Sequence, residues 1–77
     1  MGDTSRITRD PTIMAGKPCI RGMRVTVAMI VNQIAEGATI ENLLEEFPYL
    51  EHEDIVQALR YAAYLASNQE IDLSPAA

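Results

Sequence analysis

The sequence of 77 residues is poor in cysteine and in large aromatic residues, and each shortage excludes a class of structure. Cys19 is the only cysteine, so the chain cannot form an internal disulfide or a thiolate metal cluster. We expect Cys19 to be a small, half-buried apolar residue. With no Trp and a single Phe, the core has to be built mainly from aliphatic side chains.

Long hydrophobic runs and a secretory signal are also missing. No apolar run approaches the roughly 20 residues that a membrane span needs, and the first residues lack the charged-then-apolar pattern of a signal peptide. We therefore expect a cytoplasmic protein with no membrane partner.

The residues of enzyme and metal sites are scarce as well. His52 is the only histidine, and no serine or cysteine is spaced to act as its nucleophile. The neighbouring acids Glu45 and Glu46 point in different directions on a helix, as do Glu53 and Asp54, so neither pair forms an acid–base dyad. No His or Cys pair has metal-ligand spacing. The sequence predicts a protein that is not an enzyme and that holds no metal or cofactor.

Charge of the two signs is unevenly distributed along the chain. Residues 1–26 carry five basic and two acidic residues, a net charge of +3, whereas residues 27–77 carry one basic and nine acidic residues, a net charge of −8. Together they give the formal net charge of −5. An acidic, solvated face is normal for a helical domain. The concentration of five of the six basic residues in residues 1–26 suggests an anionic partner.

From residue 27 the apolar residues recur with the period of a helix, and their spacing predicts three helices, over 27–36, 40–47 and 52–67. Pro48 disfavours a helical conformation at Phe47 and ends the second helix there. The last two helices are joined by only a few residues, which is the outline of a three-helix, helix-turn-helix domain.

The ends and the core of these helices can also be predicted. Thr26 and Thr39 are suited to cap the first two helices at their N-termini, and Gly37 is suited to end the first. The apolar stripes predict a core made of Ile30, Ile34, Leu43, Leu44, Phe47, Ile55, Leu59 and Ala62.

The first 26 residues read as a small β element. Residues 6–8 alternate like a short edge strand, and Gly22-Met23 lies between Ile20-Arg21 and Arg24-Val25 as in a hairpin with a type II′ turn. In that register Arg21 and Arg24 face each other and, with Lys17, make a candidate site for an anionic partner or nucleic acid. The alternative is that these guanidinium groups extend into water or bind nearby carboxylates.

These elements predict a mainly α protein with a short N-terminal β-hairpin and a single domain over residues 1–68. Its parts are a β head over 6–26 and helices over 27–67, followed by a mobile tail over 69–77. A chain this short builds a thin core, and the third helix is apolar most of the way round. We therefore expect a homodimer with interfaces on the head or the third helix.

Several segments occur in an order and spacing that resemble the domain of unknown function 433 family. They are Gly37 and the stretches 6–11, 13–25, 47–50, 53–55 and 58–62. The resemblance implies a small prokaryotic domain with a homeodomain-like helix-turn-helix. It also implies an antitoxin-like protein encoded beside a PIN-like ribonuclease toxin, which such antitoxins bind along with their own operator DNA.

Two positions depart from the family pattern. Met23 stands where the family usually has Thr, and Glu51 stands where Thr or Ser usually caps the third helix. From the family's basic motif we carry over Lys17, Arg21 and Arg24 as the partner-binding residues.

Two functions remain open. The first is a type II antitoxin that neutralises a PIN-like toxin through its basic hairpin, and the alternative is a DNA-binding regulator of the helix-turn-helix type. A recognition helix offers its N-terminal residues to a groove lined by phosphates. Here those residues are Glu51, Glu53 and Asp54, which argues against insertion into a DNA groove.

Overall fold

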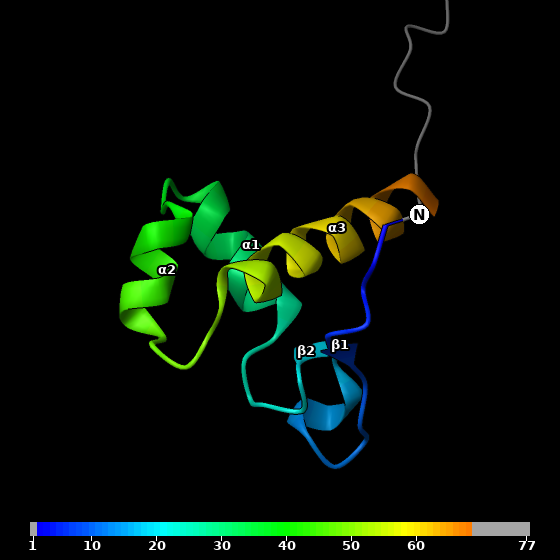
Figure 1. Cartoon of the computed structure of the whole chain (residues 1–77). Helices are drawn as coiled ribbons and strands as arrows, with labels where there is room; N and C mark the ends of the chain where they lie inside the picture. The colour runs from blue at the N-terminus through cyan, green and yellow to red at the C-terminus, as the bar shows by residue number, and fades with distance from the viewer. Residues whose placement is uncertain (1, 69–77) are drawn as a thin grey trace, which may run out of the picture.

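The computed structural model describes residues 2–68 and shows a mainly α protein with a short antiparallel strand pair near its N-terminus (Figure 1). The helices agree with the predicted ones to within one residue at each end, and the predicted tail, 69–77, lies outside the described residues. The elements in order are β1 (Ile7–Thr8), the 3-10 turn η1 (Met14–Gly16), β2 (Cys19–Ile20), α1 (Val27–Ala35), α2 (Ile40–Glu46) and α3 (His52–Asn68).

The helix α1 begins and ends at the residues that its sequence signals predict. The Thr26 hydroxyl accepts a hydrogen bond from the Met29 amide at 3.0 Å, which satisfies one of the free N–H groups at the helix start. At the other end Gly37 has a φ of 102°, and its amide and that of Ala38 donate to carbonyls of the last turn, each at 3.0 Å. This is a Schellman motif, which needs a left-handed residue and so favours glycine.

The short helix α2 has a reciprocal cap. The Asn42 amide N–H donates to the Thr39 hydroxyl at 3.0 Å, and the Asn42 side-chain oxygen accepts from the Thr39 amide at 3.0 Å. Phe47, the residue before Pro48, has a φ of −121° and lies outside the helix. Both ends of α2 are therefore set by local residues, as predicted.

In the head, residues 6–26, β2 lies between two partners. It pairs with β1 in an antiparallel register that places Ile7 opposite Ile20. On its other side Cys19 forms an isolated bridge with Thr26, the N-cap of α1. The head is thus a small β element whose last residue leads directly into the first helix.

The turn that follows β2 differs from the predicted one. Arg21 and Gly22 have φ angles of 45° and 71°, and the Met23 amide donates to the Ile20 carbonyl at 2.7 Å. Positive φ at both central residues is the signature of a type I′ turn, so the predicted type II′ turn centred on Gly22 and Met23 is wrong. The left-handed conformation is unfavourable for a residue with a side chain, and at Arg21 it needs compensation from contacts elsewhere.

A second left-handed segment forms the tip of the head. Met14, Ala15 and Gly16 have φ angles of 50°, 57° and 81°. The amides of Gly16 and Lys17 donate to carbonyls within this turn at 3.0 and 3.1 Å. Non-glycine residues persist in this region only where surrounding structure holds them, so Lys17 follows a fixed turn.

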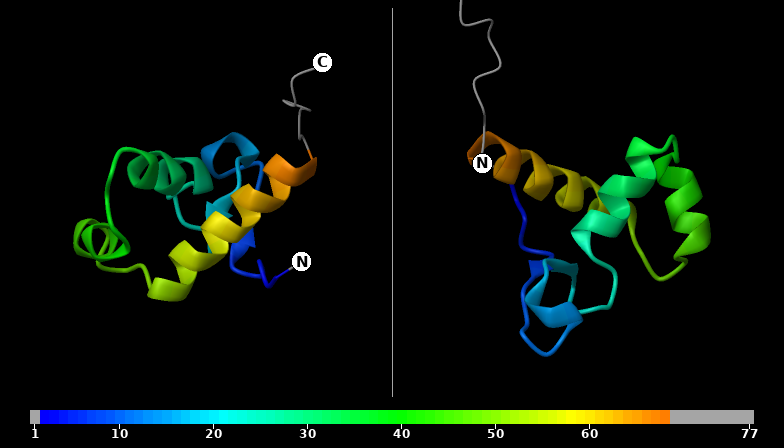
Figure 2. Two further views of the ribbon diagram at one scale, coloured as in Figure 1. Left: turned by 90° about the horizontal axis from the view of Figure 1, so that it is seen from above. Right: turned by 180° about the vertical axis from the view of Figure 1, so that it is seen from behind.

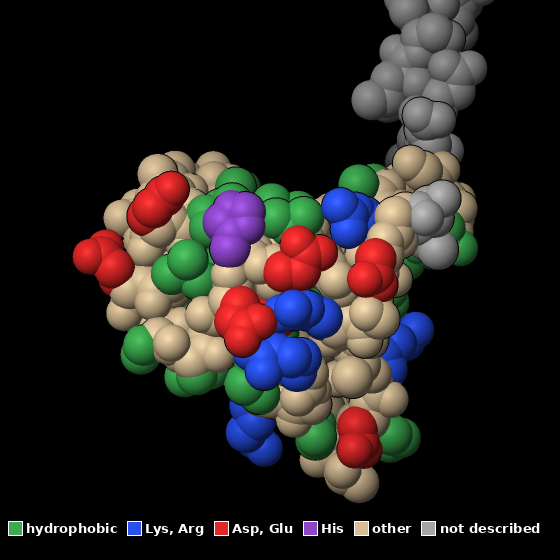
Figure 3. Space-filling view, in the orientation of Figure 1, with side chains coloured by type: hydrophobic (Ala, Val, Ile, Leu, Met, Phe, Trp, Pro, Cys, Tyr) green, Lys and Arg blue, Asp and Glu red, His purple; other side chains and the backbone are tan. Residues whose placement is uncertain are grey.

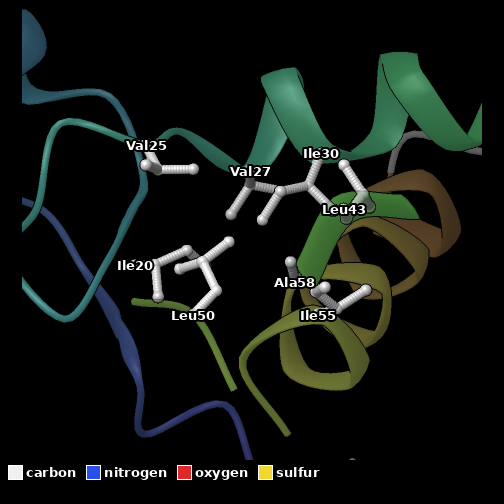
Figure 4. Packing of buried hydrophobic residues seen from close by; sticks show 8 residues of the cluster. All are labelled: Ile20, Val25, Val27, Ile30, Leu43, Leu50, Ile55 and Ala58. Carbon is white, nitrogen blue, oxygen red and sulfur yellow. The ribbon is translucent and has the colours of Figure 1, made fainter. Parts of the chain in front are cut away.

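The core lies where the three helices meet the inner side of the head (Figure 4). Three predicted core residues, Ile30, Leu43 and Ile55, are fully buried. The other five predicted core residues pack against the core but are only half-buried, so their predicted full burial is wrong. They are Ile34, Leu44, Phe47, Leu59 and Ala62. The head and the α2–α3 connection shift the core toward the start of α1. The buried apolar residues outside the predicted core list are Cys19, Ile20, Val25, Val27, Leu50 and Ala58.

The arrangement in space places α1 between α2 and the head. Figures 1 and 2 show α2 on one side of α1, the head on the other, and α3 crossing α1. The strand β1 also contacts α3, so residues near the two ends of the described chain lie side by side. This contact positions the basic residues of the head against an acidic helix end.

Candidate functional site

Arg21, one of the three predicted site residues, binds a carboxylate of the chain itself. Its Nε donates to Asp54 Oδ1 at 3.0 Å and its Nη2 donates to Asp54 Oδ2 at 2.8 Å, a bidentate pair. The same Nη2 also donates to the Tyr49 carbonyl at 3.1 Å. These contacts hold the type I′ turn against α3, and they offset the unfavourable backbone conformation of Arg21.

Asp54 is the centre of this contact and its side chain has no exposed surface. Besides Arg21, it accepts a hydrogen bond from Arg6 Nη1 at 3.0 Å and one from the Glu51 amide at 2.8 Å. Glu51 in turn accepts from Arg6 Nη1 at 2.6 Å. We call Asp54, Arg6, Arg21 and Glu51 the Asp54 cluster. Figure 3 shows basic and acidic side chains in contact on one face of the molecule.

The Asp54 cluster also caps α3. Glu51 immediately precedes the helix, and its own side chain is bonded to Arg6 rather than to a backbone amide. Asp54 supplies one half of a capping box from the first turn, because its carboxylate accepts from the Glu51 amide. The Asp54 amide, which a Thr or Ser hydroxyl at position 51 would bind, donates instead to the Glu51 carbonyl at 2.9 Å, so the departure from the family pattern leaves neither amide without an acceptor.

The electrostatics of the cluster keep Asp54 ionised. Burial raises the pKa of Asp54, but the hydrogen bonds from Arg21, from the Glu51 backbone and from Arg6 outweigh this effect and lower the pKa from 3.8 to about 2. The hydrogen bonds to Glu51 and Asp54 raise the pKa of Arg6. The cluster is therefore charged at neutral pH, with its buried anion fully paired.

Gln57 extends the connection between the head and α3. This side chain is almost fully buried, and its Oε1 accepts from the Arg6 amide at 2.8 Å. Its Nε2 donates to Asp3 at 3.2 Å and to Glu53 at 3.1 Å. The first residues of the described chain are thus held to α3 by polar contacts.

Lys17 and Arg24, the other two predicted site residues, are exposed. In residues 2–68 neither side chain forms an ion pair. The predicted face-to-face pairing of Arg21 with Arg24 is wrong, because the turn is centred on Arg21 and Gly22 and directs Arg21 to Asp54. The structure therefore divides the predicted site into one arginine that is bonded to α3 and two cations that are exposed.

Sequence reasoning missed Arg6, Asp54 and Gln57. In the sequence Asp54 is one of three acids at the start of the third helix. A signal is present, since Asp54 is four residues before the apolar Ala58 and so lies on the same helix face. An acidic residue on a buried face needs a cationic partner, and the partners of Asp54 are Arg6 and Arg21 in the head, 48 and 33 residues away.

Among residues 2–68, no group of three or more His, Cys, Asp and Glu residues is placed to hold a metal ion. No helix among these residues is long and apolar enough to cross a bilayer.

The chain matches a family model described as protein of unknown function (DUF433), over residues 7–62. It belongs to this family. The match includes Lys17, Arg21, Arg24 and Asp54, so both parts of the divided site lie within the DUF433 region.

A curated relative, the uncharacterized protein y4eO of Sinorhizobium fredii, is 39% identical to the chain over 56 residues. The alignment covers 73% of this chain and 25% of that protein, so the chain spans about a quarter of the length of this relative. No solved structure matches the chain.

Proposed function

We propose that this chain is a non-enzymatic, antitoxin-like protein that acts in the cytoplasm, where it binds and neutralises a PIN-like ribonuclease. Lys17 and Arg24 make the contact, and the partner surface is the acidic, metal-holding pocket of the ribonuclease. The observation that carries the proposal is the division of the basic motif, in which Arg21 is bonded to Asp54 while Lys17 and Arg24 stay exposed.

Preorganisation of the head supports this role. Arg24 follows a type I′ turn that is fixed on α3 through Arg21, and Lys17 follows the left-handed turn η1. Side chains carried by fixed backbone lose less freedom on binding than those on a flexible arm. An exposed guanidinium and an exposed ammonium on such a scaffold suit a pocket lined by carboxylates.

Reading of DNA by α3 is less favoured. The N-terminal turn of a recognition helix meets the phosphates and base edges of a groove. In this chain that turn carries Glu51, Glu53 and Asp54, and it is already covered by Arg6 and Arg21. DNA held by Lys17 and Arg24 is the alternative that the experiment below distinguishes.

The experiment is a neutralisation assay with the PIN-like ribonuclease encoded beside the gene. RNA cleavage is measured against increasing amounts of the wild-type chain, Lys17→Ala, Arg24→Ala and the matched control Arg9→Ala. Arg9 is an exposed head residue outside the basic motif, and its loss changes the net charge equally. We expect the wild type and Arg9→Ala to stop cleavage, and each site variant to need about tenfold more protein.

Operator DNA is titrated with the same four proteins. If DNA is the partner, cleavage is unaffected by any of them, and loss of Lys17 or Arg24 flattens the salt dependence of DNA binding by about one unit per lost phosphate contact. Equal neutralisation by the site variants and the control would show that the head cations do not contact the ribonuclease.

A further inference from the structure

An apolar groove runs between α1 and α3 beside the head. Its volume is about 330 Å3. None of its lining residues is charged, although the chain contains six basic and eleven acidic residues. The lining residues are Pro18, Val27, Ala28, Val31, Asn32, Tyr61, Ala62 and Leu65, and we call this surface the α1–α3 groove.

The end of α3 beyond the groove is also uncovered. Every residue from 63 to 68 is exposed, and among them Tyr64 and Leu65 have 40% and 41% of their surfaces in contact with solvent. The helix has 17 residues against 9 in α1, so its C-terminal part projects past α1, as Figures 1 and 2 show. Leu65 therefore both lines the α1–α3 groove and is exposed to solvent.

We propose that the α1–α3 groove is the surface on which a second copy of this chain binds. A two-fold interface requires a patch that is complementary to itself, and a groove whose wall includes the exposed Leu65 offers both a recess and an apolar side chain for the recess of the second copy. Each copy places the Leu65 side of its α3 against the groove of the other. This inference concerns a surface other than the head cations and goes beyond the proposed function.

The charge distribution favours a second copy at this groove over the acidic face of α2. A chain with a net charge of −5 repels its own copies wherever acidic faces meet. The exposed acids Glu41, Glu45 and Glu46 make α2 such a face, whereas the groove lining brings no charge into the contact. Two copies can therefore bury the groove without desolvating a charged side chain.

Asn32 gives this interface a register. It is exposed, and it supplies the only amide side chain of the lining, with one acceptor and two donor hydrogens. An amide in an otherwise apolar contact has to find a partner, and across a two-fold axis the amide of the second copy is available. The pairing of Asn32 with Asn32 fixes how the two copies align.

The experiment is sedimentation equilibrium of the full chain at micromolar concentration, with variants from both walls of the groove. Ala28→Asp and Leu65→Asp place a carboxylate at exposed positions of α1 and α3, where the fold tolerates it. Ala63→Asp is the matched control, since Ala63 is exposed, lies outside the lining and, two residues from Leu65, is on the opposite side of α3. We expect dimers of the wild type and of Ala63→Asp, and a dissociation constant raised at least about tenfold in both groove variants.

A second measurement tests the register. In Asn32→Cys the new thiol is exposed while Cys19 stays buried, so oxidation should link two copies through position 32. A wild-type chain that sediments only as a monomer would overturn the proposal, and so would groove variants that dimerise as well as Ala63→Asp. A monomer whose groove is shielded only when the ribonuclease is added would assign the groove to that partner instead.

Discussion

In the helical part of this molecule apolar side chains hold the elements together, whereas the head is held on α3 by a buried carboxylate and two arginines. Ile30, Leu43 and Ile55 are fully buried between the helices. The head contributes Ile20 and Val25 to that core, but its orientation depends on Asp54. The comparison shows how a short chain can attach an irregular segment to a helix through buried ion pairs, where no β-sheet hydrogen bonds join the two.

The largest effect is expected from the helical core. Ile55→Ala removes a fully buried side chain at the start of α3 and should lower the free energy of unfolding by about 2 to 5 kcal/mol. The half-buried Leu59, one turn later on the same helix, is the matched comparison and should lose about 1 to 2 kcal/mol. Urea unfolding followed by circular dichroism measures both, and equal losses would contradict the core described here.

The next effect should separate the head from the helices. Asp54→Ala removes the anion that Arg6 and Arg21 share and leaves the Glu51 amide without an acceptor. The arginines reach water, so we expect a loss of about 2 to 3 kcal/mol, the low end for a broken buried pair. Amide exchange should rise at Ile20 more than at Leu43, and uniform exchange at the two sites would contradict a head held by Asp54.

Acid should weaken the same connection. The folded state lowers the pKa of Asp54 to about 2, below its ordinary value of 3.8, so the ionised form stabilises the fold. This stabilisation, about 2 kcal/mol, is complete above roughly pH 5 and is lost as the pH falls toward the folded-state pKa. Urea unfolding of the wild type and Asp54→Asn from pH 6 to 2 should show a gap that closes in acid. A gap that is constant across this range would refute the ion pairing.

The smallest effect is expected at a helix end that depends only on its neighbours. Thr39→Ala removes one half of the reciprocal cap on α2 and should cost about 1 kcal/mol. Ser at the same position keeps the acceptor oxygen and should restore most of the loss. Thermal unfolding compares the three proteins, and a Thr39→Ala variant as stable as the wild type would show that the cap contributes nothing.

The sequence predicted the helices well because their information is local. The caps at Thr26 and Thr39, the stop at Gly37 and the apolar period lie within a few residues of the structure they specify. The core was predicted less well, since burial of Ala58 and Val27 depends on which segments cover the helices.

The head was predicted least well because its geometry depends on residues far along the chain. The local pattern around Gly22 favours a type II′ turn. The observed turn is held by bonds to residues outside that pattern, from Arg21 to Asp54, 33 residues away, and from the Gly22 amide to the Thr8 hydroxyl. The sequence predicts Arg21 as a partner contact, but in the structure its bonds to Asp54 attach the head to α3. Partner contact by Lys17 and Arg24 remains a proposal.

The most direct test of this division is the affinity of the ribonuclease for the double variant Lys17→Ala/Arg24→Ala, measured by calorimetry beside Arg9→Ala. The double variant keeps the Asp54 cluster and should unfold in urea at the wild-type midpoint. We predict a dissociation constant raised by about two orders of magnitude, with Arg9→Ala unchanged. An affinity of the double variant equal to that of Arg9→Ala would contradict the assignment of the exposed head cations to partner binding.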